Sequence, residues 1–295
     1  MIEVKALSEC PLTDAAEAWN KGFSDYYSNL RMPVDQLAFR FGNDQISPRF
    51  SFVAYDDGQP VGVILNAIQT FNGTKWAWNG GTSVSPLHRG QGIGKKLMEA
   101  TMEIYRKEDV ERASLEAFSV NENAIRLYES FGYETVDRLL FLKSTDTFLM
   151  EEKNEYLLEN GLAKRAACLP FYQEQVPWQT RWNFIRQGEA VIAKNRDGEP
   201  VGYALYQKRN TEDGSLAAVT LFQCIAAENQ SDREGILKSM LANVFSGEKS
   251  YPRVVYNLPK SNELLIRILK SSGFKEMYTD SGTLLEQVFM ICHPK

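Results

Sequence analysis

Apolar residues follow two kinds of pattern along the chain, and together they predict alternating strands and helices. Short apolar runs predict strands at the N-terminus and at residues 75–84 and 113–119. Apolar positions at helical spacing predict helices at 12–29, 34–44, 94–107 and 121–131. This order of elements is typical of an α/β fold in which flanking helices cover a mixed sheet.

A hexapeptide near the middle of the first half recurs in the second half. Asp57-Gly58-Gln59-Pro60-Val61-Gly62 returns 140 residues later as Asp197-Gly198-Glu199-Pro200-Val201-Gly202. Each copy lies between apolar runs, and Asp-Gly provides the positive φ that a tight turn requires. Both copies therefore predict a β-hairpin.

A second match at nearly the same offset makes an internal repeat. The segment from Asn121 to Tyr133 aligns with the segment from Asn262 to Phe274, 141 residues apart. In the second half, residues 219–226, 232–245, 253–258 and 262–272 then occupy the same strand and helix slots. A length of 295 residues also favours two domains, which we predict at 1–147 and 148–295 with a linker near 143–154.

The most informative motif runs from a strand through a glycine-rich turn into a helix. Its letters are Val84-Ser85-Pro86-Leu87-His88-Arg89-Gly90-Gln91-Gly92-Ile93-Gly94-Lys95. Main-chain amides at such a helix start can bind phosphate, and glycines let the backbone approach the anion. A Rossmann motif would need Gly at 95 and a P-loop would need Gly at 89, so both are excluded.

Two motifs together resemble the GNAT (GCN5-related N-acetyltransferase) superfamily. Arg89, Gly92 and Gly94 match its pyrophosphate motif [RQ]-x-x-G-x-G, and Asn121, Ala124, Leu127, Tyr128, Gly132 and Tyr133 match N-x-x-A-x-x-L-Y-x-x-x-G-[FY]. The resemblance covers essentially residues 1–145 and is to tandem-domain bacterial members. It implies two tandem GNAT-like domains, with residues 1–147 as an acetyl-CoA-binding catalytic domain.

The resemblance also implies a set of cofactor-binding positions. The amides from Gly90 to Lys95 would hold the pyrophosphate of acetyl-CoA, and the pantetheine arm would lie between two parting strands near Val84. Gly80-Gly81 suits a bulge that begins this parting. The full set of expected cofactor-binding residues is Val84, Arg89, Gly90, Gln91, Gly92, Ile93, Gly94, Lys95 and Asn121.

Two residues are candidates for proton transfer under the same resemblance. Tyr128 occupies the family's usual position for the acid that protonates the departing thiolate. Glu116 precedes it by 12 residues, a spacing similar to the base and acid pair of the ribosomal-protein N-terminal alanine acetyltransferases. A solvated edge residue or an ion-pair partner is an equal alternative for Glu116. His88 lies in the turn before the glycines, where exposure is expected.

The second copy departs from the family pattern at the same positions. Arg89, Gly90 and Gly92 are replaced by Gln230, Ser231 and Arg233, Tyr128 is replaced by Leu269, and only Gly94 is kept, as Gly235. We therefore expect residues 148–295 to form a degenerate, non-catalytic GNAT-like domain. Covering the substrate cleft, making a homodimer contact and binding an effector all remain open as its role.

Composition limits the partners and the compartment. Residues 1–147 carry 15 basic against 20 acidic side chains and residues 148–295 carry 18 of each, which argues against nucleic-acid or anionic-membrane binding. The four scattered cysteines and two histidines predict no metal site and no disulfide framework. With no targeting or membrane segment recognised, we expect a cytoplasmic protein.

The sequence thus predicts an acetyl-CoA-dependent N-acetyltransferase that acts on a primary amine. The acceptor is a small molecule, an antibiotic or a peptide N-terminus, and nothing in the sequence separates these. A coenzyme-A-binding sensor and a structural tandem module are the alternatives, and retention of Tyr128 favours the enzyme.

Overall fold

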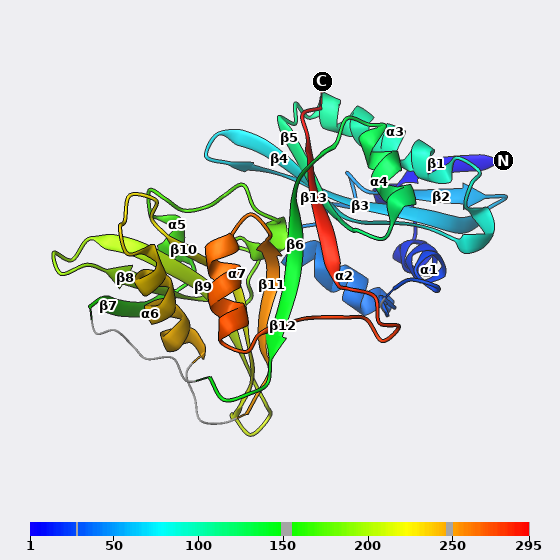
Figure 1. Ribbon diagram of the computed structural model, residues 1–295. Coiled ribbons are helices and arrows are strands. Elements are labelled where there is room, and N and C mark those ends of the chain that lie inside the picture. The colour runs from blue at the N-terminus through cyan, green and yellow to red at the C-terminus, as the bar shows by residue number, and fades with distance from the viewer. Residues whose placement is uncertain (28, 149–154, 246–249, 295) are drawn as a thin grey trace. The chain divides into compact units, whose positions relative to one another are not determined.

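A computed structural model describes residues 1–27, 29–148, 155–245 and 250–294, which form two compact units (Figure 1). The first unit comprises residues 1–136, 279–283 and 287–295, and the second comprises residues 137–278 and 284–286. Each unit has its own strands and helices and its own apolar core.

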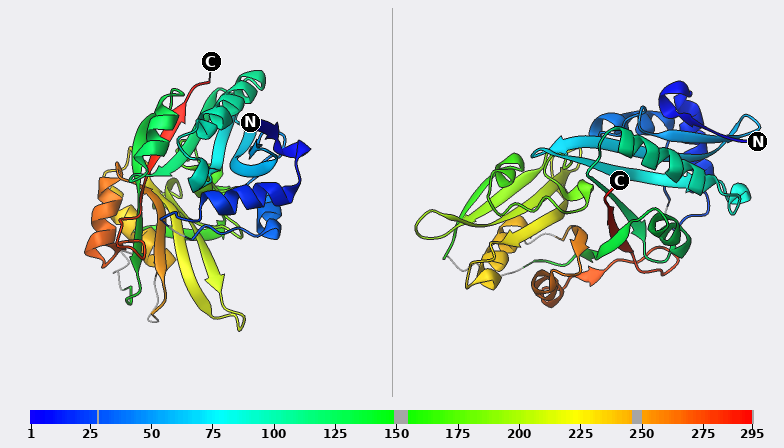
Figure 2. Two further views of the ribbon diagram at one scale, coloured as in Figure 1. Left: turned by 90° about the vertical axis from the view of Figure 1, so that its right-hand side faces the viewer. Right: turned by 90° about the horizontal axis from the view of Figure 1, so that it is seen from above.

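The first unit contains six neighbouring strands with helices on both faces. Its strands, in sheet order, are β1 (Ile2–Ala6), β2 (Phe52–Asp56), β3 (Gln59–Phe71), β4 (Thr74–Val84), β5 (Arg112–Phe118) and β13 (Glu286–Cys292). All neighbours are antiparallel except β4 and β5. Figure 1 and Figure 2 show α1 (Leu12–Gly22) and α2 (Val34–Asn43) on one face, and α3 (Ile93–Lys107) and α4 (Glu122–Glu129) on the other.

Local sequence explains most of these elements. Asp57 and Gly58 both adopt positive φ, 45° and 78°, and so close the tight turn between β2 and β3. Helix α3 buries Ile93, Leu97 and Met98 against the sheet while its lysines stay in solvent. The short 3₁₀ segments are Leu7–Glu9, Pro86–His88 and Trp178–Thr180.

The second unit repeats this plan. Its sheet order is β6 (Glu134–Ser144), β11 (Arg253–Pro259), β10 (Leu216–Ala226), β9 (Pro200–Asn210), β8 (Glu189–Lys194) and β7 (Leu157–Leu162), with β12 (Lys275–Glu276) on β6. Its helices are α5 (Lys164–Ala167), α6 (Arg233–Phe245) and α7 (Glu263–Ser271). As β4 does with β5, β10 pairs with β11 in parallel.

Corresponding helix caps support the repeat at atomic detail. Asn121 and Asn262 cap α4 and α7 with side chains that each accept an amide hydrogen bond of 3.3 Å. Gly132 and Gly273 end these helices with φ of 83° and 88°.

The compact units do not follow the two halves of the chain, because most of one strand from each half belongs to the other unit. Strand β13, at the end of the chain, pairs with β5 and completes the first unit. Strand β6, which follows α4, pairs with β11 in the second unit. The expected division at 1–147 and 148–295 therefore differs from the observed units.

Two local expectations also need correction. The helix expected at 12–29 ends at Gly22, because the chain folds back and Trp19 Nε1 donates to the carbonyl of Leu30 at 2.7 Å. The linker expected near 143–154 begins inside β6, and its residues 149–154 lie outside the described part of the chain. None of the described helices is both long enough and apolar enough to cross a membrane.

Candidate active site

The glycine-rich turn leaves a row of main-chain amides without acceptors. Gly90 and Gly92 adopt φ of 77° and 78°, and Gly92 caps α3. The Arg89 amide donates to the Pro86 carbonyl and the Lys96 amide to the Gly92 carbonyl, but within the described residues the amides from Gly90 to Lys95 donate to no protein acceptor. A helix start with open amides is a binding site for an anion such as a phosphate.

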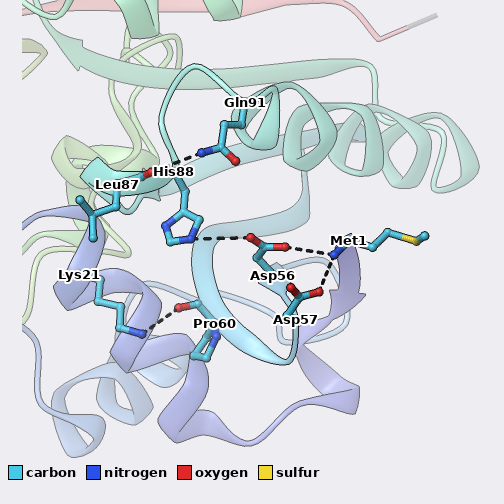
Figure 3. Close-up of polar contacts among 8 residues, drawn as sticks. All are labelled: Met1, Lys21, Asp56, Asp57, Pro60, Leu87, His88 and Gln91. Carbon is cyan, nitrogen blue, oxygen red and sulfur yellow. Dashed lines mark hydrogen bonds and ion pairs between the residues drawn. The ribbon is translucent and has the colours of Figure 1, made fainter.

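These amides border a cavity of about 650 Å³ in the first unit. Eight of the nine expected cofactor-binding residues line it: Val84, Arg89, Gly90, Gly92, Ile93, Gly94, Lys95 and Asn121. The ninth, Gln91, is not among the lining residues, because its amide turns to the carbonyl of Leu87 at 3.3 Å (Figure 3). A Cβ at Gly90 or Gly92 would meet no atom within 4 Å, so these glycines face open space.

The cavity lies where two parallel strands part. β4 and β5 pair from Trp76 to Trp78 and no further, although both strands continue. The register of β4 against β3 skips Gly80, and Gly81 has φ of 142°. The expected bulge at Gly80-Gly81 is therefore confirmed, and it leaves the end of β4 unpaired with β5.

Tyr128 stands in the wall of this cavity on α4. Its side chain is buried, with 6% exposure, and its ring lies 6.1 Å from that of Tyr133. Burial raises the pKa of Tyr128, and a hydrogen bond with the Thr82 hydroxyl acts in the opposite direction. The phenol is therefore neutral at physiological pH and able to donate a proton.

Glu116 lies on the opposite face of the sheet from Tyr128. Its neighbours Leu115 and Ala117 belong with Tyr128 to the core beneath α3 and α4, so alternation turns Glu116 to the face of α1. Phe118 shares that face and contacts the rings of Tyr26 and Tyr27. Glu116 does not line the cavity itself.

His88 lines the cavity beside the glycine-rich turn. Its side chain is 26% exposed, less than its place in a turn suggested, and its Nε2 lies 3.9 Å from Oδ2 of Asp56. Figure 3 shows this imidazole facing the β2–β3 turn, where the Met1 ammonium also contacts Asp56 and Asp57. This orientation gives His88 a charged neighbour in Asp56.

Arg89 is held by protein groups rather than left open to an anion. Its guanidinium donates to both oxygens of Asp25 at 2.7 and 2.8 Å, to the Gly22 carbonyl at 2.9 Å and to the Val84 carbonyl at 3.2 Å. The hydrogen bond from Arg89 lowers the pKa of Asp25. Arg89 thus joins the end of α1 to the end of β4.

Asp25 is a cavity residue that sequence reasoning did not assign. It belongs to the segment 23–27, which also brings Tyr26 to the β5 side, where the Tyr26 hydroxyl bonds Asn121 and burial raises the pKa of Tyr26 to about 12. The segment therefore crosses the opening between β4 and β5. Nothing in the sequence Phe23-Ser24-Asp25-Tyr26-Tyr27 indicates that Asp25 pairs with Arg89, which lies 64 residues away.

Replacing Asp25 with asparagine is expected to tighten the binding of coenzyme A, the phosphate-bearing ligand that the sequence motif predicts for this cavity. The change removes a negative charge from the cavity wall and releases Arg89, and a half-exposed ion pair is worth about 0.2–1 kcal/mol. We expect Kd to fall by about 3-fold at low salt and the gain to vanish at high salt. Calorimetric titration measures this, with Glu17→Gln, which removes an acidic charge from α1 outside the cavity, as the control. An equal gain in both variants would refute a local effect.

The corresponding site in the second unit is closed by its own side chains. At the start of α6, Asp232 Oδ1 accepts from the Gly235 amide at 2.9 Å, and Oδ2 accepts from the Tyr156 hydroxyl at 3.1 Å. A carboxylate thus occupies the place of an anion. The cavity between β10 and β11 is about 40 Å³ and mainly apolar, and Leu269 is buried in the core.

Comparison with known proteins identifies the domain that contains the open site. Residues 12–133 match the model of the acetyltransferase (GNAT) family. This part of the chain is similar to the GNAT acetyltransferases. Its turn of open amides and its parted strands lie within or directly beside the matched range.

Individual relatives agree with this family. The chain is 28% identical over 151 residues to N-alpha-acetyltransferase 30 of Schizosaccharomyces pombe, covering 50% of this chain and 95% of the relative. It is 33% identical over 110 residues to the Dictyostelium discoideum protein of that name, covering 37% of this chain and 59% of the relative. Both relatives are eukaryotic, so a bacterial origin stays a prediction.

A solved structure is similar in fold to both units of the chain. The tandem GNAT protein from the clavulanic acid biosynthesis pathway matches with a TM-score of 0.59 and 14% identity over 100% of this chain and 99% of that chain. At this identity the likeness concerns the fold. The predicted fold of two tandem GNAT-like domains is thereby confirmed.

Proposed function

We propose that the first unit transfers an acetyl group from acetyl-CoA to a primary amine by direct attack. One observation carries the proposal: a row of open amides and a buried, neutral Tyr128 border the same cavity. The amides can donate hydrogen bonds to the diphosphate of acetyl-CoA. The phenol can donate the proton that the coenzyme A thiolate needs when it leaves.

Each wall of the cavity has a separate task in this proposal. The amides from Gly90 to Lys95 hold the diphosphate, and the exposed Lys95 adds a positive charge. The unpaired end of β4 offers main-chain groups near Val84 to the pantetheine amides and to the tetrahedral oxyanion. Asn121, tied to Tyr26, lines the arm of the donor.

The proton movements follow from the two faces of the sheet. The amine nitrogen attacks the thioester carbonyl, a C–N bond forms, and the C–S bond then breaks as Tyr128 gives its proton to sulfur. The amine proton passes to Glu116, directly or through water, on the α1 face. Acid and base on opposite faces suit a thioester that lies between the parted strands.

We further propose that the acceptor is a peptide α-amine. The relatives named above are N-alpha-acetyltransferases. An α-amine has a pKa of about 8 and is partly unprotonated at neutral pH, whereas a lysine side chain is almost fully protonated. The second unit is proposed to be non-catalytic, because Asp232 fills its anion position.

Two measurements test this function. Calorimetry with coenzyme A is expected to give one site per chain, and thiol release from acetyl-CoA is expected with peptides but not with peptides whose N-terminus is blocked. Small amines and lysine side chains serve as competing acceptors. Two coenzyme A sites would refute the assignment of the second unit, and no thiol release with any amine would refute the transferase.

A further inference from the structure

Two polar side chains on β4 contact each other only because the strand is bulged. Asn79 and Thr82 are three residues apart, and in a regular strand such residues point to opposite faces. The extra residue Gly80 shifts the alternation by one position, since Leu65 pairs with Gly81 and Asn66 with Asn79. The Asn79 amide nitrogen consequently reaches the Thr82 hydroxyl oxygen at 2.7 Å.

The orientation of the Asn79 amide is determined by the backbone of the same bulge. The Gly81 amide donates to Asn79 Oδ1 at 2.7 Å, so Nδ2 must be the atom that faces Thr82. Asn79 then donates to Thr82, whose single hydroxyl proton is left to donate elsewhere. Thr82 and Tyr128 line the same cavity, and a hydrogen bond from Thr82 opposes the effect of burial on the pKa of Tyr128.

We infer that Thr82 is a positioning residue for Tyr128, and that Asn79 directs the Thr82 hydroxyl toward the phenol oxygen. The inference rests on the proposed function, in which Tyr128 is the acid. When the phenol O–H bond breaks and an S–H bond forms on the departing thiol, the negative charge passes to the phenol oxygen. Thr82 donates a hydrogen bond to that oxygen until water returns the proton.

Burial makes this hydrogen bond consequential. Tyr128 and Asn79 are each 6% exposed, so the phenolate has little access to bulk water. A hydrogen bond to a charged group is stronger than one to a neutral group, so it stabilises the phenolate more than the phenol. This hydrogen bond therefore raises the rate of the chemical step and does not change the affinity for acetyl-CoA.

Thr82→Val tests this by removing the hydroxyl at nearly constant shape. We expect kcat to fall by about 10- to 100-fold, with KM for acetyl-CoA within 2-fold of the wild-type value. Thr82→Ser keeps the hydroxyl and is expected to stay within about 3-fold of wild type. An equal loss in both variants, or a loss confined to KM, would overturn the inference.

A double mutant tests whether Thr82 acts through Tyr128. In the Tyr128→Phe background, Thr82→Val should lower kcat by less than about 2-fold, because its partner is already gone. Additive losses would overturn the inference. If Tyr128→Phe leaves kcat unchanged, Tyr128 is not the acid and the proposed function is wrong on this point. If Tyr128→Phe lowers kcat but Thr82→Val does not, only the positioning role of Thr82 is wrong.

Asn79→Asp provides a second variant for the direction of the Thr82 proton. The carboxylate still accepts from Gly81 but now attracts the Thr82 proton, so kcat should fall although no contact atom is lost. Coenzyme A binding by calorimetry checks that every variant is folded. Wild-type kcat in Asn79→Asp would overturn the role assigned to Asn79.

Discussion

Replacing Met290 with aspartate is expected to unfold the unit that contains the cavity lined by Tyr128. Met290 lies on β13 opposite Leu115 of β5, with 0% exposure. It packs in the same core as Leu97 and Tyr128. A charge without a partner there costs more than about 4 kcal/mol, a large part of the stability of a domain.

Thermal unfolding with and without coenzyme A measures this result. The variant should lose the transition that coenzyme A stabilises while keeping the transition of the second unit. Met290→Leu preserves volume and polarity, so it should cost less than about 1.5 kcal/mol and keep coenzyme A binding. If the aspartate variant still binds coenzyme A with wild-type affinity, β13 does not complete this unit.

This exchange of strands was beyond sequence reasoning for a physical reason. β6 and β13 both carry a central apolar run, Leu139 to Leu142 and Val288 to Met290, which predicts burial but names no partner. Partner choice depends on contacts far apart in sequence, such as Met290 with Leu115. Because the two repeats share one fold, each of these strands could pair at the equivalent position in either repeat.

Features set by neighbouring residues were predictable. The glycine-rich turn and Gly132, which follows the helix predicted at 121–131, depend on backbone conformations that few residues adopt, and both lie where the sequence indicated. The strand and helix that flank the turn were predicted to within one or two residues.

The side-chain contacts of the site were harder to predict from the sequence. The bulge at Gly80 was predictable from two glycines in a strand, but its effect on Asn79 and Thr82 requires the register against β3. Arg89 was expected to face an anion, and its pairing with Asp25 depends on where α1 ends. Such contacts are decided by tertiary packing rather than by local preference.

Tyr128→Phe is expected to lower kcat by about 100-fold or more while coenzyme A still binds. The change removes one hydroxyl and keeps the ring in its core, and a positioned general acid contributes about 10²- to 10⁴-fold. Thiol release measures kcat, and calorimetry measures binding. Tyr133→Phe is the matched control, because its ring is buried beside Tyr128 but does not line the cavity.

The pH profile adds a check on the same acid. Burial raises the pKa of Tyr128 above its ordinary value of 10.0, so the proton-donating form is lost only as pH rises through that raised value. Wild-type activity should therefore rise as the acceptor amine loses its proton and then stay level up to about pH 10. A decline between about pH 7 and 9 would point to a different acid. Turnover by Tyr128→Phe equal to that of Tyr133→Phe would lead to the same conclusion.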